Sequence, residues 1–123
     1  MGRMERLNET FKREISLIIQ KELKDPRLGF ITINRVEITK DLSYAKIFFT
    51  VLGSEKDANL ALHGLQSAAG YIRRLLSDRI EIRHSPELVF TLDKSIEYSM
   101  HIYEEIERLK NESKKSSKRN KKT

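Results

Sequence analysis

The sequence predicts a single α+β domain, and three features of its apolar pattern support that prediction. Residues 3–24 place apolar side chains at the spacing of one helical face. Residues 30–39 and 44–52 are rich in β-branched and aromatic residues around a short polar turn, which is typical of a hairpin. Residues 58–77 return to helical spacing. A chain of 123 residues fits one domain, which can bury roughly two-thirds of its unfolded surface.

The first predicted helix is amphipathic and ends at Asp25-Pro26, because the residue before proline disfavours the helical backbone. Its apolar stripe consists of Leu7, Phe11, Ile15, Ile18, Ile19 and Leu23. Its other face carries Arg3, Arg6, Lys12, Arg13, Lys21 and Lys24. Two interpretations of this basic face stay open, a solvated surface and a surface that contacts phosphate.

The predicted hairpin contains an irregularity in its first strand. Ile33 and Val36 fall on opposite parities, so a β-bulge near residues 34–35 is needed to keep both side chains in the core. One face of the second strand is expected to be core and consists of Ala45, Ile47, Phe49 and Val51. The other face consists of Tyr44, Lys46, Phe48 and Thr50, and it suits either base stacking or partly buried cross-strand contacts.

The second predicted helix begins at a capping box formed by Ser54 and Asp57. Glycine inside a helix costs roughly 1 kcal/mol relative to alanine. The run Ala68-Ala69-Gly70 therefore predicts a joint that divides this helix into a kinked pair. The first turn of the second segment would then present free amide groups, which attract phosphate.

Two more elements and a tail complete the predicted order. Residues 80–83 and 87–92 are interpreted as one strand interrupted at Ser85-Pro86. Ser95 can cap a last helix with an acidic outer face, so the domain is expected to span residues 1–110. The apolar stripe of that helix consists of Ile96, Met100, Tyr103, Ile106 and Leu109. Residues 111–123 have no apolar side chain to bury and are expected to be disordered.

The distribution of charge points to a polyanionic partner. The chain carries a net charge of +6, and residues 111–123 hold six basic residues against one acid. Composition also excludes several kinds of chemistry. Cysteine is absent, and the three histidines lack a metal-binding spacing, so we expect no disulfide, metal or cofactor. We find no membrane-spanning run or signal peptide and expect a cytoplasmic monomer without a small-molecule substrate.

The element order resembles that of a K-homology domain of the second topology, which implies a three-stranded sheet with helices on one face. The particular residues go further and resemble the bacterial ribosome-binding factor A family over residues 1 to about 110. The residues that match, in order, are Asp25-Pro26-Arg27, Ile31-Thr32-Ile33, Val36, Asp41-Leu42, Ala45-Lys46-Ile47, Ala68-x-Gly70-Tyr71-Ile72-Arg73, Pro86-x-Leu88-x-Phe90 and Asp93-x-Ser95.

This resemblance implies a non-catalytic assembly factor. Such a factor binds the free 30S subunit and its 16S rRNA and assists late maturation and rRNA processing, especially in the cold. The chain lacks the GxxG loop with which ordinary K-homology domains clamp a nucleic-acid backbone, and Ala68-Ala69-Gly70 occupies that joint. Binding is therefore expected to depend on flanking basic residues.

The predicted RNA-binding residues lie on the first helix, the second strand, the segment after Gly70 and the tail. They are Arg3, Arg6, Arg13, Lys46, Arg73, Arg74, Arg79, Arg83, Lys114, Lys115, Lys118 and Arg119. The alternative for the arginines after Gly70 is a solvated surface. Alternative functions are a ribosome-silencing factor, a general RNA-binding factor, and a ribonuclease that uses Glu104 and Glu105.

Overall fold

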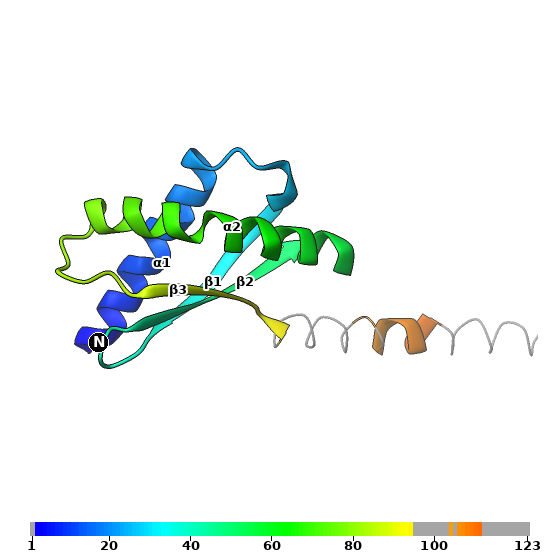
Figure 1. The fold of residues 1–123 in the computed structure, drawn as a ribbon. Helices are drawn as coiled ribbons and strands as arrows, with labels where there is room; N and C mark the ends of the chain where they lie inside the picture. Colours follow the sequence, from blue (N-terminus) through cyan, green and yellow to red (C-terminus); the bar gives the residue numbers. More distant parts are fainter. Residues whose placement is uncertain (1, 95–103, 105, 112–123) are drawn as a thin grey trace, which may run out of the picture. The chain divides into compact units, whose positions relative to one another are not determined.

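A computed structural model of the chain describes residues 2–94, 104 and 106–111 (Figure 1). The chain divides into two compact units, Met1–Asp93 and Lys94–Thr123. In the second unit the described residues are helical, and most of the helix predicted from Ser95, like the tail from residue 112 onward, lies outside the described residues. The first unit contains α1 (Arg3–Glu22), η1 (Pro26–Leu28), β1 (Phe30–Ile38), β2 (Tyr44–Leu52), α2 (Glu55–Arg79) and β3 (Glu87–Leu92).

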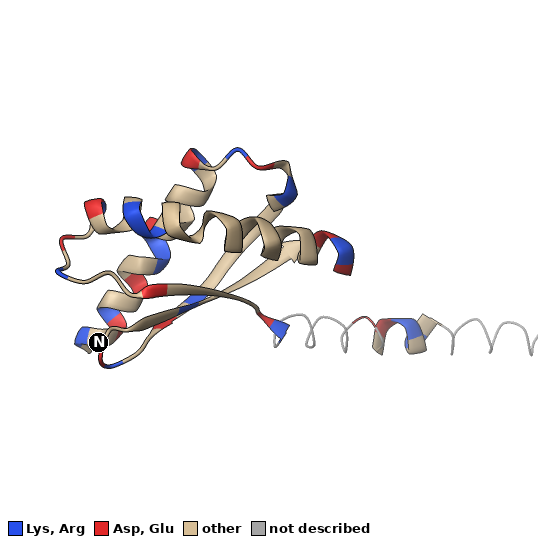
Figure 2. Cartoon of the chain, viewed as in Figure 1, with Lys and Arg blue, Asp and Glu red and all other residues tan. Residues whose placement is uncertain are grey.

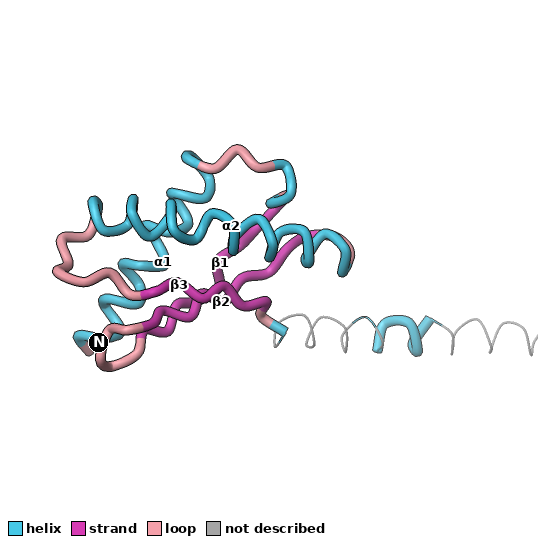
Figure 3. Tube along the Cα trace, viewed as in Figure 1, coloured by secondary structure: helices cyan, strands magenta, loops and turns pink. Residues whose placement is uncertain are grey.

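The sheet has three strands in the order β1-β2-β3 (Figure 3). Strand β1 is antiparallel to β2, and β3 is parallel to β2. The register of the hairpin shifts between Ile33 and Arg35, which confirms the predicted bulge. Because of that shift, Ile33 and Val36 are both buried although their parities differ.

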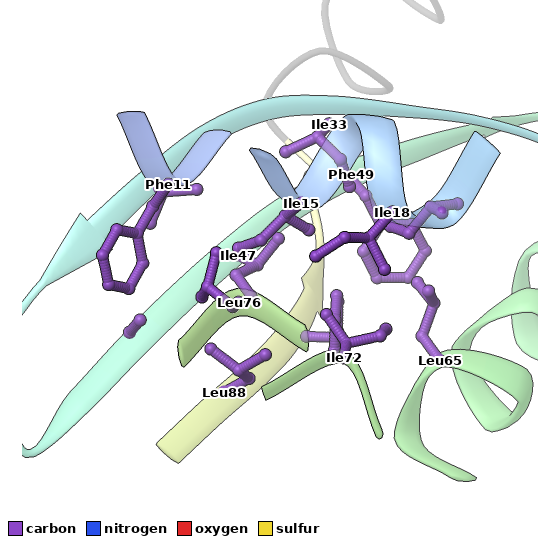
Figure 4. Close-up of a cluster of buried hydrophobic side chains, with 14 of the residues drawn as sticks. Phe11, Ile15, Ile18, Ile33, Ile47, Phe49, Leu65, Ile72, Leu76 and Leu88 are labelled. Carbon is purple, nitrogen blue, oxygen red and sulfur yellow. The ribbon is translucent and has the colours of Figure 1, made fainter. Parts of the chain in front are cut away.

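Both helices pack on the same face of this sheet, and together they enclose the core (Figure 4). Side chains from α1, α2 and all three strands interdigitate there, so no single element forms the core alone. The largest completely buried apolar side chains are Phe11, Ile15, Ile18, Ile47, Phe49, Leu65, Ile72 and Leu76. Burying one such side chain contributes about 1.5–3 kcal/mol, which makes this layer the main source of stability. The predicted α+β class and the one-sided helix layer are confirmed.

Helix α2 differs from the sequence prediction because it is a single helix from Glu55 to Arg79. The chain stays helical through Ala68, Ala69 and Gly70, so these residues do not separate two helices, and the joint predicted there lies inside α2. Alanine has the highest helix propensity, so Ala68 and Ala69 continue the helix, and one glycine costs too little to interrupt 25 residues. Because Gly70 lies inside α2, no first helical turn with free amides follows it directly for phosphate to bind.

The segment between α2 and β3 also differs from its prediction. Residues 80–83 form no strand, because Ile80 is the C-cap of α2 and its amide donates to the Leu76 carbonyl at 2.8 Å. Pro86 is buried just before β3 and has no amide to donate to a strand partner. The segment is thus a loop that returns the chain from the end of α2 to the sheet.

Gly64 and Gly70 occupy very different surroundings on α2. An added Cβ at Gly64 would lie 2.8 Å from Leu28 Cδ2, so Gly64 allows η1 to pack closely against the helix. An added Cβ at Gly70 would meet no heavy atom within 4 Å, and the backbone there is not left-handed. Only Gly64 is therefore required for packing.

We expect Gly70→Ala to raise the free energy of unfolding by up to about 1 kcal/mol, because it adds helix propensity without a clash. Gly64→Ala is the matched control, since it adds the same propensity but must displace Leu28. Urea denaturation of the two variants measures the difference. A destabilised Gly70→Ala would show that the chain needs a break at this position.

The predicted capping box at the start of α2 is confirmed. The Asp57 amide donates to Ser54 Oγ at 3.2 Å, and the Ser54 amide donates back to Asp57 Oδ2 at 2.9 Å. The pKa of the Asp57 carboxyl is lowered first by the hydrogen bond from the Ser54 amide and then by one from the Ser54 hydroxyl, which donates to Asp57 Oδ2 at 3.0 Å. The pKa of Asp25 is lowered by its side-chain hydrogen bond with Arg27, and that of Asp41 by hydrogen bonds from Ser43 and Thr39.

These three carboxylates make stability depend on pH in the acid range. Their pKa values are lower in the folded than in the unfolded chain, so their stabilisation is present above the unfolded value near 3.9 and is lost as the pH falls through the folded values. We expect Asp57→Asn to flatten the fall in unfolding free energy between pH 5 and pH 2, measured by urea denaturation.

The control for this experiment is Asp78→Asn near the other end of α2. Asp78 is exposed and makes no hydrogen bond to any residue within the described part of the chain. Its substitution leaves the hydrogen bonds between Ser54 and Asp57 in place, so the contribution of the capping box should remain. An equal flattening by both variants would contradict the role given to the capping box.

Candidate nucleic-acid interface

A shallow, open hollow of about 330 Å³ lies between the C-terminal third of α2 and the loop that leads to β3. Helix α2 has no charged residue between Asp57 and Arg73, so its basic residues gather toward this end (Figure 2). The residues that line the hollow are Gly70, Arg73, Arg74, Ser77, Arg83, His84 and Ser85. This lining contains three arginines and no carboxylate, so the hollow favours an anion.

Arg73 fixes the shape of the hollow. Its Nε and Nη2 atoms donate to the Ser85 carbonyl oxygen at 3.2 and 2.6 Å. These two bonds join α2 to the loop across 12 residues of sequence and hold that loop against the helix. The Arg73 guanidinium therefore combines a structural contact with a positive charge on the wall of the hollow.

Arg74 and Arg83 supply charge that is not neutralised locally. Both residues are exposed, and neither makes an ion pair or hydrogen bond with another described residue. A guanidinium presents five donors in a planar fork that matches the oxygens of a phosphate. These two side chains are consequently free to bind an anion that enters the hollow.

Arg79 belongs to a different environment, although it was predicted with the same group. Its Nη1 atom lies 3.6 Å from Glu14 Oε2, and its Nη2 atom lies 3.4 Å from Glu22 Oε1. These ion pairs connect the end of α2 to α1. Arg79 does not line the hollow, and two carboxylates already compensate its charge, so its role in RNA binding stays a prediction that the geometry disfavours.

The predicted basic residues of α1 are exposed as expected. Arg3, Arg6 and Arg13 recur at three- and seven-residue intervals, which places them on one face of the helix. Arg13 has only a long contact of 3.8 Å with Glu14, and 70% of its side chain is exposed. These residues form a second basic surface, separate from the lining of the hollow.

Lys46 lies on the face of the sheet that the helices leave uncovered. Its strand neighbour Phe48 is half-buried beneath Arg35, whose guanidinium carbon lies 3.8 Å from the centre of the Phe48 ring. Arg35 in turn donates to Asp93 Oδ2 at 3.1 Å. Of the two interpretations of this face, the structure supports cross-strand contacts at Phe48. Tyr44, on the same face, is 49% exposed, so this burial does not extend to it.

The remaining predicted positions divide into two groups. Ala68 and Ala69 are half-buried and pack against the core, whereas Gly70 is exposed and lines the hollow. The tail residues Lys114, Lys115, Lys118 and Arg119 lie outside the described residues. Within the described residues, no group of three or more potential ligands could hold a metal ion, and no helix has the length and apolar character to cross a membrane.

Two residues of the hollow, Ser77 and Ser85, were not predicted from the sequence. Ser85 was interpreted only as part of an interruption between two strand segments, and serine has no sequence pattern that marks such a position. Arg73 was predicted for its charge alone, and its bonds to the Ser85 carbonyl depend on how the loop folds. The hollow is thus a tertiary feature.

Comparisons with known proteins agree on one family. A family model described as ribosome-binding factor A matches residues 3–106. A ribosome-binding factor A of Acetivibrio thermocellus is 53% identical over 103 residues, covering 83% of this chain and 84% of the relative. One of Clostridium botulinum is 50% identical over 107 residues, covering 85% and 92% of the two chains.

Solved structures give the same result for the fold. The crystal structure of ribosome-binding factor A from Thermus thermophilus aligns with a TM-score of 0.67 at 29% identity, covering 72% of this chain and 93% of that one. A Thermus thermophilus homology model fitted into the cryo-electron microscopy map of a 30S–RbfA complex aligns with a TM-score of 0.62 at 28% identity, covering 74% and 96%. The matching span, the sequence identities and the shared fold together show that the chain belongs to the ribosome-binding factor A family.

Proposed function

We propose that this protein is an assembly factor that binds the free 30S subunit through its 16S rRNA and promotes late maturation of that RNA. The observation that carries the proposal is the hollow beside Gly70, which has three arginines in its lining and no carboxylate. The role includes 16S rRNA processing and support of growth in the cold. The protein acts as a cytoplasmic monomer without a cofactor.

The comparisons support the partner named in this proposal. One structural relative was fitted into the map of a 30S–RbfA complex, and this chain covers 96% of that relative. The 30S subunit presents a dense array of phosphates, which attracts exposed arginines and makes binding depend on salt. The hollow and the basic face of α1 supply such arginines on the described part of the chain.

We further propose that the protein assists maturation by binding and does not cleave RNA. Hydrolysis of a phosphodiester needs a positioned acid and base or a metal-bound water. Among the residues that line the hollow, only His84 could act as a general acid or base, so the lining lacks a second such group to form the pair. Incubating the purified protein with precursor 16S rRNA and magnesium should leave the RNA uncut.

Reversing the two free charges of the hollow should weaken binding to the subunit. We expect the double variant Arg74→Glu, Arg83→Glu to bind immature 30S particles at least about tenfold more weakly, because each guanidinium removed takes away charge-assisted hydrogen bonds to phosphate. Co-sedimentation with particles from cold-grown cells measures this change.

The matched control is Lys56→Glu, which has the same change of charge per residue at the other end of α2. Lys56 lies about 27 Å from Arg74 along the helix axis. It should leave co-sedimentation close to that of the wild type. Equal binding by the wild type and the double variant would remove the hollow from the interface, and recovery on 70S particles instead of free 30S subunits would favour a ribosome-silencing role.

The basic tail is proposed to add affinity that is sensitive to salt and independent of sequence. Deleting residues 111–123 removes six basic residues. The slope of log affinity against log salt concentration should become shallower by nearly one for each phosphate that the tail no longer neutralises. Binding to 30S particles between 50 and 200 mM salt measures this slope. The control is a variant with a tail of equal length in which those six residues are serine or glutamine. Equal slopes for the wild type and the deletion variant would refute the proposal.

A further inference from the structure

We infer that the hollow beside Gly70 is a discrete site for one phosphate with its attached ribose, and that the Ser85 hydroxyl donates a hydrogen bond to that phosphate. This inference deepens the proposed function and depends on it only in naming RNA as the source of the phosphate. A diffuse basic surface would need arginines alone, whereas a built site also has neutral donors and a defined shape.

Ser85 gives the first argument for a built site. Its Oγ atom is buried and has no hydrogen-bond partner among the described residues. Buried hydroxyl groups nearly always have partners, so an unpartnered one requires an explanation. Ser85 lines the hollow, and an anionic oxygen entering beside it would supply the missing acceptor.

The charged side chains give the second argument. Arg73 already uses its Nε and Nη2 atoms to hold the Ser85 carbonyl, and this contact keeps residue 85 at the wall of the hollow. Arg74 and Arg83 come to the same hollow from the helix and the loop. Three positive charges repel one another unless an anion lies between them, and the lining contains no carboxylate to fill that role.

The shape of the hollow is compatible with a nucleotide. The hollow is shallow and open, so its volume of about 330 Å³ admits a nucleotide without setting an upper limit on ligand size. Gly70 has no side chain, and nothing lies within 4 Å of the position its Cβ would take, so a ligand can approach the helix backbone closely. The hollow is open, so a continuous RNA strand can pass through it, and we commit to an RNA backbone phosphate as the occupant.

Binding of inorganic phosphate to the full chain tests the site without any ribosomal particle. A ligand that binds only the folded state raises the unfolding midpoint in proportion to its affinity. We expect phosphate to raise the thermal midpoint of the wild type above that in chloride at equal ionic strength. Ser85→Ala and Arg74→Gln should each lower phosphate affinity about tenfold, because each removes a hydrogen bond to a charged group.

Two controls separate the site from general effects. Ser67→Ala removes an exposed hydroxyl of α2 outside the hollow, and Lys56→Gln removes a charge at the far end of the helix. Both should keep the wild-type response to phosphate. Heteronuclear NMR of the wild type should show shifts concentrated at the amides of residues 70–85. A midpoint that does not respond to phosphate, or an equal response from Ser85→Ala, would overturn the inference.

The source of the phosphate is tested with two further probes. A short single-stranded oligoribonucleotide should bind more tightly than adenosine 5′-monophosphate and should lose affinity in Ser85→Ala. Tighter binding of the mononucleotide would overturn RNA as the source. If the protein responds to phosphate but does not sediment with 30S particles, the result supports the site and contradicts the proposed function. Failure of the site and failure of the proposed function are therefore distinguishable.

Discussion

The packing of α2 along the sheet is the contact on which the rest of the structure depends. Leu65, Ile72 and Leu76 are completely buried on one side of this helix. A helix turns by 3.6 residues, so fixing Ile72 in the core directs Arg73 and Arg74 away from it. Core packing therefore fixes the backbone positions from which Arg73 and Arg74 extend toward the hollow.

The local patterns of the sequence predict most of this fold. The parity change between Ile33 and Val36 predicts the bulge, and Ser54 with Asp57 predicts the start of α2, because both depend on neighbouring residues alone. The different roles of the two glycines inside α2 are not predictable in this way. An added Cβ at Gly64, not Gly70, meets a neighbour, and only the packing of Leu28 against the helix reveals this difference.

The functional site is less predictable because it is assembled by contacts between distant parts of the chain. Arg73, Arg74, Arg79 and Arg83 are indistinguishable as charges in the sequence. In the structure Arg79 pairs with two glutamates of α1, whereas Arg73 binds the carbonyl of Ser85. The sequence thus predicts that a basic site follows Gly70, and tertiary structure decides which arginines belong to it.

The unbroken helix also changes how this domain can bind a nucleic-acid backbone. A GxxG loop presents backbone amides to the strand, and a helix beginning after Gly70 would do the same through its free first turn. With the helix continuous through that point, its amides are committed to internal hydrogen bonds. In the binding mode proposed above, guanidinium groups take over this role, and they reach farther than amides and bind phosphate less tightly as the salt concentration rises. If this proposal holds, single substitutions of these side chains should change the affinity for RNA while leaving the backbone unchanged.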